Sequence, residues 1–103
     1  MSKTEKDQEF FNIADAFIDL ANHHCSDIDK GKVSAGFLYA AARFNTYIVA
    51  SSAKDVDEFE SFQAKAAEYF VGEFRKMINE HMEDYKVNFD DYIKLNNANK
   101  TIN

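Results

Sequence analysis

Apolar positions recur with a helical period along the first quarter of the chain. At about 100° per residue, one side of such a helix collects Phe10, Ile13, Ala14, Phe17, Ile18, Leu20 and Ala21. The opposite side carries Asn12, Asp15, Asp19 and Asn22. The pattern predicts an amphipathic helix from about Thr4 to Cys25 or Ser26. The polar stretch SDIDKGK, residues 26–32, then predicts a loop.

The next segment is the most apolar of the chain and predicts a central helix from about Val33 to Ala53. Asp55-Val56-Asp57-Glu58 follows as a capping box, which marks the start of a third helix. Its apolar stripe continues to Tyr92, which is about 60 Å for an unbroken helix. Asn88, followed by Asp90 and Asp91, has the pattern of a new N-cap, which predicts a break and a short fourth helix from Phe89 to about Leu95.

Composition narrows the fold class. The chain has 103 residues, no proline and three glycines, so the residues typical of tight turns between strands are largely missing. Short connections make successive helices antiparallel. We therefore predict an all-α fold, a three-helix antiparallel bundle with a short C-terminal fourth helix. It should form one domain over residues 1–103, ordered from about 5 to 95, with a flexible tail at 96–103.

Net charge and cysteine content exclude several classes of protein. The formal charge is −6, from 12 basic and 18 acidic residues, and the basic residues are scattered, which disfavours nucleic acid. No apolar run is long enough to cross a membrane. The single Cys25 cannot form an internal disulfide and suits a reducing compartment. These features indicate a cytoplasmic protein that binds neither nucleic acid nor membrane.

Two amides lie within apolar faces. Asn45 falls inside the apolar arc of the second helix, and Gln63 is the one amide on the stripe of the third. If these helices turn back around Lys54, positions 45 and 63 lie side by side. A lone buried amide would cost about 1–3 kcal/mol, so we predict a buried hydrogen-bonded pair that fixes the register of the two helices.

Arg43 interrupts the same helix on its opposite side, with Tyr39 and Tyr47 four residues before and after it. Two tyrosine rings can stack on a guanidinium, and the simplest interpretation is a partly exposed, stacked arginine. Tyr and Arg are also enriched at interface hot spots. Tyr39, Arg43 and Tyr47 are therefore the candidate interaction surface, for a partner or a second copy.

Candidate chemistry is weak. Asp15, Asp19 and His23 recur every four residues, a spacing that could place a carboxylate and an imidazole on one metal ion. They lie on the solvated face, however, where an ordinary surface contact is the simpler interpretation. His24 and His81 fall on apolar faces and Cys25 is beside His24, so a small pocket near these three residues is conceivable. Core or boundary histidines are the commoner explanation. The sequence assigns no catalytic, metal or cofactor-binding residue and implies no cofactor.

Four segments together resemble a known family: FFNIADAFIDLAN, GKVSAGFLYAAARFNTYIVA, EYFVGEFRKM and DYKVNFDDY. They are similar to the bacterial family catalogued as domain of unknown function 3144. The similarity covers roughly residues 10–92, and AAARFN is its most specific part. The resemblance implies a small all-helical protein, and it implies no activity, substrate or catalytic residue.

Two functions from different classes remain open. The first is a non-enzymatic interaction or regulatory protein that acts through a helical surface. A homodimer is plausible because the far end of the third helix presents unsupported apolar residues, namely Met77, Ile78, Met82, Tyr85, Phe89 and Tyr92. The alternative is a small helical enzyme, or a metal-binding or ligand-binding protein, with a pocket near His24, Cys25 and His81.

Overall fold

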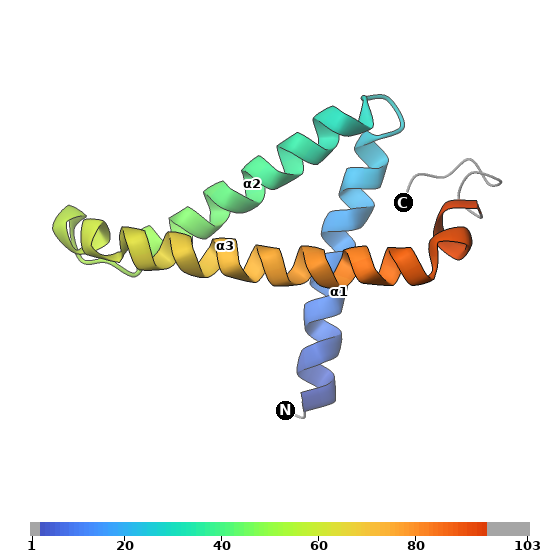
Figure 1. Ribbon diagram of the computed structural model, residues 1–103. Helices are drawn as coiled ribbons and strands as arrows, with labels where there is room; N and C mark the ends of the chain where they lie inside the picture. Colours follow the sequence, from blue (N-terminus) through green and yellow to red (C-terminus); the bar gives the residue numbers. More distant parts are fainter. Residues whose placement is uncertain (1–2, 95–103) are drawn as a thin grey trace. The chain divides into compact units, whose positions relative to one another are not determined.

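The computed structural model describes residues 3–94, which contain three long helices and one short helical turn (Figure 1). The long helices are α1 (Lys3–His24), α2 (Lys30–Ser51) and α3 (Val56–Val87), and the short π-helical turn η1 spans Asp90–Lys94. Within residues 3–94 there is no strand. The predicted all-α class, three main helices with a short C-terminal element, is confirmed. The predicted flexible tail, residues 96–103, lies outside the described residues.

Contacts divide the chain into two compact units. The first contains α1 and the start of α2, up to Ala40, and the second contains the rest of α2, α3 and η1. The prediction of a single domain stays a prediction. None of residues 7–94 is fully buried, so the packing within each unit leaves its apolar side chains partly open.

The start of α2 differs from the prediction because Asp29 caps it. The Oδ2 atom of Asp29 accepts a hydrogen bond from the backbone N–H of Lys32 at 3.3 Å, and its carbonyl accepts one from Val33 at 3.1 Å. A Cβ atom on Gly31 would come to 2.9 Å from that carboxylate oxygen, so glycine leaves room for the cap. Residues 30–32, predicted to lie in the loop, therefore belong to the helix.

The predicted capping box at the start of α3 is confirmed. The Oδ1 atom of Asp55 accepts a hydrogen bond from the backbone N–H of Glu58, and the side chain of Glu58 accepts one from the N–H of Lys54, both at 2.9 Å. These two bonds satisfy donors that the helix itself cannot satisfy. The acids in the first turn are also favoured by the helix dipole.

The second unit is held by a hairpin of α2 and α3. Within the hairpin, the half-buried apolar side chains of the second unit are Val49, Ala53, Phe59, Phe62, Ala66 and Phe70. On α3 these positions follow a spacing of three or four residues, which places them along one side of the helix. The hairpin therefore uses only one face of α3, and other apolar positions of the same helix remain exposed.

Candidate functional site

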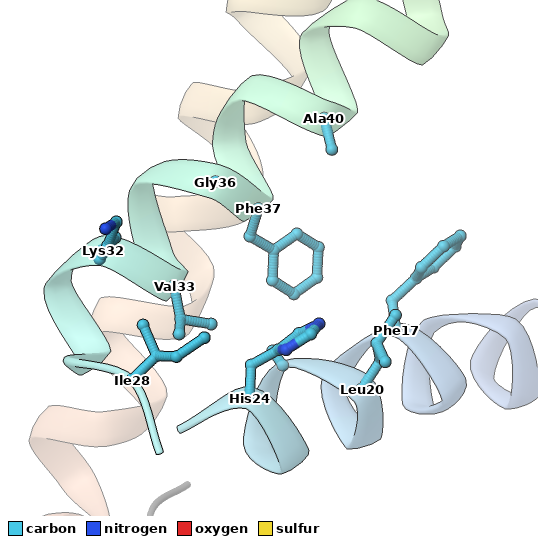
Figure 2. A pocket seen from close by; sticks show the side chains of 10 residues that line it. Phe17, Leu20, His24, Ile28, Lys32, Val33, Gly36, Phe37 and Ala40 are labelled. Atoms are coloured by element: carbon cyan, nitrogen blue, oxygen red, sulfur yellow. The ribbon is translucent and has the colours of Figure 1, made fainter. Parts of the chain in front are cut away.

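An apolar groove lies between α1 and the first turns of α2 (Figure 2). It belongs entirely to the first unit and has a volume of about 490 Å³. The ring centroids of Phe17 on α1 and Phe37 on α2 lie 6.5 Å apart across it. The whole lining consists of Phe17, Leu20, Ala21, His24, Ile28, Lys32, Val33, Gly36, Phe37 and Ala40.

The shape of the groove follows from the sizes of these residues. On α1, the residues come from the amphipathic face that the sequence pattern defines. On α2, Gly36 and Ala40 are small and one helical turn apart, and nothing lies within 4 Å of a Cβ placed on Gly36. The middle of the α2 wall consequently has no bulky side chain, so another surface can approach the helix backbone there.

Polar groups are confined to one end of the groove. His24 closes α1, and Figure 2 shows its imidazole directed toward Phe37, while Lys32 lies on the first turn of α2. No acidic side chain contributes to the lining. The site is thus an apolar surface with basic or neutral polar groups at one end, which suits a ligand that is apolar along its length and acidic near one edge.

The three residues of the predicted pocket are not all in this groove. His24 lines it, but Cys25 is half-buried just after α1 and is not part of the lining. His81 is exposed on α3, in the second unit. Among the described residues, no group of three or more His, Cys, Asp or Glu side chains could hold a metal ion.

The residues of the candidate interaction surface are all exposed. Tyr39, in the first unit, is 68% exposed, and Tyr47, in the second, is 63% exposed. Arg43 is exposed as well. The ring of Tyr47 lies 6.2 Å from that of Phe44. Use of these three side chains in binding stays a prediction.

The two predicted core amides both belong to the second unit. Asn45 is half-buried and Gln63 is exposed. Their pairing as a buried register-fixing contact stays a prediction.

Sequence analysis missed a polar cluster at the end of α3. Asp84 accepts hydrogen bonds from Asn88 Nδ2 at 2.8 Å and from Tyr92 Oη at 2.9 Å, one on each carboxylate oxygen. The ring centroids of Tyr85 and Tyr92 lie 4.5 Å apart. The hydrogen bond to Asp84 and the negative charge of that group raise the pKa of Tyr92. The eight-residue spacing between Asp84 and Tyr92 gave no helical signal for this contact.

Asn88 also has a different role from the predicted one. It ends α3 as its C-cap, since its backbone N–H donates to the carbonyl of Asp84 at 2.9 Å. The predicted break is therefore correct, but the fourth helix is one π-helical turn. An α-type bond from the N–H of Tyr92 to the carbonyl of Asn88, 3.1 Å long, links this turn to the end of α3. Leu95, the predicted end of that helix, lies outside the described residues.

Comparison with known proteins gives a family but no activity. Residues 10–86 match DUF3144, described as a protein of unknown function. The chain belongs to this family. A solved structure similar to that of this DUF3144 chain is the NMR structure of NB7890A from Shewanella sp., with a TM-score of 0.69 and 32% sequence identity. The match covers 81% of this chain and 88% of NB7890A.

A search of curated proteins found no match to this DUF3144 chain. Within residues 3–94, no helix combines the length and the apolar character that crossing a membrane requires. The family's match includes the whole groove region from Phe17 to Ala40. The family assignment brings no substrate or partner with it, so function has to be argued from the groove and the exposed helix faces.

Proposed function

We propose that this DUF3144 protein is a non-enzymatic interaction protein that binds an apolar helix face of another protein chain in the groove between α1 and α2. The observation that carries the proposal is the groove itself, two facing helix walls with apolar side chains along their length and a low glycine and alanine segment in one wall. Laying an amphipathic helix into such a groove is a common mode of protein recognition.

The charges at the end of the groove favour one kind of helix. Lys32 contributes a cation, and His24 contributes an imidazole that can form a hydrogen bond. An apolar stripe with carboxylates along one edge would place its anions near these groups, which favours that partner over one with a basic edge. A reducing cytoplasm, consistent with the free Cys25, is the compartment that we propose for this interaction.

The second candidate function is binding of a small molecule in the same groove. A volume of about 490 Å³ lies within the ordinary range for small-molecule sites, roughly 300–1,000 Å³. His24 would then orient a polar end of the ligand. Native mass spectrometry of gently purified protein distinguishes this candidate, because a retained metal or small molecule adds mass that a protein partner does not.

The groove is tested with a synthetic amphipathic helical peptide of leucines flanked by glutamates, followed by NMR chemical shifts. We expect shifts at Phe17, Val33 and Phe37 on addition of the peptide. In the variant Gly36→Leu, a side chain fills the low segment, and binding should weaken at least tenfold. Gly72→Leu is the matched control, because Gly72 is also helical, also has nothing within 4 Å of a Cβ, and lies outside the groove.

A peptide with lysines in place of the glutamates tests the charge argument and should bind more weakly. Equal binding by Gly36→Leu and Gly72→Leu would contradict the groove as the binding site. The proposal would also fail if no groove resonance moved while His24→Ala removed a bound small molecule or metal, since that result would identify the groove as a ligand pocket.

A further inference from the structure

The last part of α3 has no counterpart on α2. The helix α3 has 32 residues and α2 has 22, so α3 is longer by about 15 Å of helix. Residues 78–87 make up this surplus. They carry apolar side chains on the same arc as residues before them, and their exposure needs an explanation.

We define the α3 end stripe as Phe74, Met77, Ile78, Met82 and Tyr85. At 100° per residue these five positions fall within an arc of about 140°. Their exposed fractions are 47, 46, 36, 65 and 37%, respectively. An exposed apolar arc of this kind, interrupted only by His81, is typical of a binding face, and its two methionines suit an adaptable contact.

Charges on α3 complement those of the groove. One edge of the α3 end stripe carries Glu73, Glu80 and Asp84, whereas Arg75 and Lys86 lie beyond the other edge. Glu73 is paired with Lys76 at 3.0 Å, and Asp84 accepts hydrogen bonds from Asn88 and Tyr92. Glu80 lies between them on the acidic edge and is the acid best placed to meet a basic group on another surface.

We propose that the α3 end stripe of a second copy of this chain occupies the groove between α1 and α2, with Glu80 of that copy near Lys32. The inference rests on the proposed function and names the helix that the groove binds. Each copy has one groove and one stripe, so the proposed dimer is the two-fold arrangement in which each groove receives the stripe of the other copy.

The areas are consistent with a stable dimer. Five side chains that are about half exposed leave on the order of 400 Å² for burial. The walls of the groove expose a smaller area, and two-fold symmetry brings the total to roughly 1,000 Å², near the lower limit for a specific interface. One contact without its symmetry mate would bury half of this area, which is below that of stable complexes.

The first experiment compares two substitutions at the same end of α3 by native mass spectrometry and sedimentation. Met82 and Val87 are 65% and 72% exposed but lie about 140° apart on the helix, so only Met82 belongs to the α3 end stripe. We expect the parent to have twice the 11.8 kDa mass of one chain, and Met82→Asp to raise the dissociation constant at least tenfold. Val87→Asp should leave it unchanged.

A charge exchange tests the orientation. Glu80→Lys and Lys32→Glu should each weaken the dimer, and the double variant should recover most of the loss, since the opposite charges then face each other again. Additive losses in the double variant would contradict the proposed contact between these two residues.

Mixing single-cysteine proteins identifies which copy supplies the stripe. With Cys25 replaced by Ser, one protein carries Ile28→Cys in the groove and the other Met82→Cys on the stripe. A disulfide between the two proteins can only be intermolecular and is the expected product. If instead a single chain with both cysteines closes an internal disulfide and the mixture forms none, the stripe of the same chain fills the groove and the proposal is wrong.

The outcomes separate this inference from the proposed function. A monomeric parent that binds the acidic leucine peptide in the groove would overturn the second copy as occupant and leave the proposed function standing. A monomer that does not bind the peptide would overturn both. If the parent is a dimer but neither Met82→Asp nor Lys32→Glu raises its dissociation constant, the dimer uses another surface and the proposal is wrong.

Discussion

Arg43 and Asn45 are neighbours in the most apolar part of α2, yet their surroundings differ. Arg43 is exposed, whereas Asn45 is half-buried in the second unit. An exposed guanidinium costs little in the free chain, because water solvates it. Its contribution would therefore come on binding, when a partner removes that water and supplies a carboxylate or an aromatic face.

If the candidate interaction surface contributes to self-association in addition to the groove, Arg43→Ala and Tyr47→Ala should each weaken that association by about tenfold or more, the size expected when a hot-spot side chain is truncated. Helix content should not change, because both side chains are exposed and alanine favours the helix. Sedimentation equilibrium measures the association, and circular dichroism measures the helix content.

Lys65→Ala is the control for Arg43→Ala, since it removes one positive charge from an exposed position on α3. If Lys65→Ala weakens association as much as Arg43→Ala does, the effect comes from net charge and the candidate interaction surface is wrong. Unchanged association in both Arg43→Ala and Tyr47→Ala would likewise show that the candidate interaction surface is wrong.

At the scale of the elements, the ends of the helices are fixed by polar side chains rather than by apolar periodicity. Asp29, Asp55 and Asn88 each bond a backbone group that the adjoining helix leaves unsatisfied. Sequence analysis found Asp55 because a capping box has a fixed spacing. It missed Asp29 because the nearby Gly31 suggested a loop, although Gly31 lies within α2 and leaves room for the capping carboxylate.

Asp84 joins η1 to α3, and its bond to Tyr92 makes that attachment sensitive to alkaline pH. The neutral phenol donates to Asp84, so the folded chain favours the protonated form and the pKa of Tyr92 is raised. The contribution of this bond is complete below about pH 10, the ordinary tyrosine value, and is lost as pH rises through the raised pKa. We expect η1 to detach from α3 in that range.

NMR of ring-labelled tyrosine measures this titration directly. Asp84→Asn should lower the pKa of Tyr92 toward the ordinary value, because it removes the charge that opposes ionisation. Asp91→Asn is the control, since Asp91 is the smallest of the contributions to the shift. Identical Tyr92 titrations in the parent and in Asp84→Asn would contradict the attachment of η1 through this bond.

At the scale of the whole molecule, the described part of the chain leaves unusually much apolar surface open. None of residues 7–94 is fully buried, and side chains such as Phe10, Phe44 and Met82 are more than half exposed. A chain of this length can bury a core of its own or share one with another chain. Shared burial links stability to protein concentration, because only the associated form covers this surface.

The melting temperature of the parent should therefore rise with concentration, by roughly 3–5 °C for each tenfold increase. Met82→Asp should remove most of this dependence, and Val87→Asp should keep it. Scanning calorimetry over a hundredfold range of concentration makes the measurement. A concentration-independent melting temperature for the parent would contradict a dimer that buries the α3 end stripe.

Local rules determined the elements of this protein, and tertiary structure decided which surfaces come together. Helical periodicity, the absence of proline and the capping box at Asp55 act within a few residues, so the sequence alone predicts the helices and the all-α class. The groove needs Phe17 and Phe37, 20 positions apart, to face each other, and the cluster at Asp84 needs η1 to turn back. Such contacts depend on loop geometry and on the angle between helices, which no local pattern encodes.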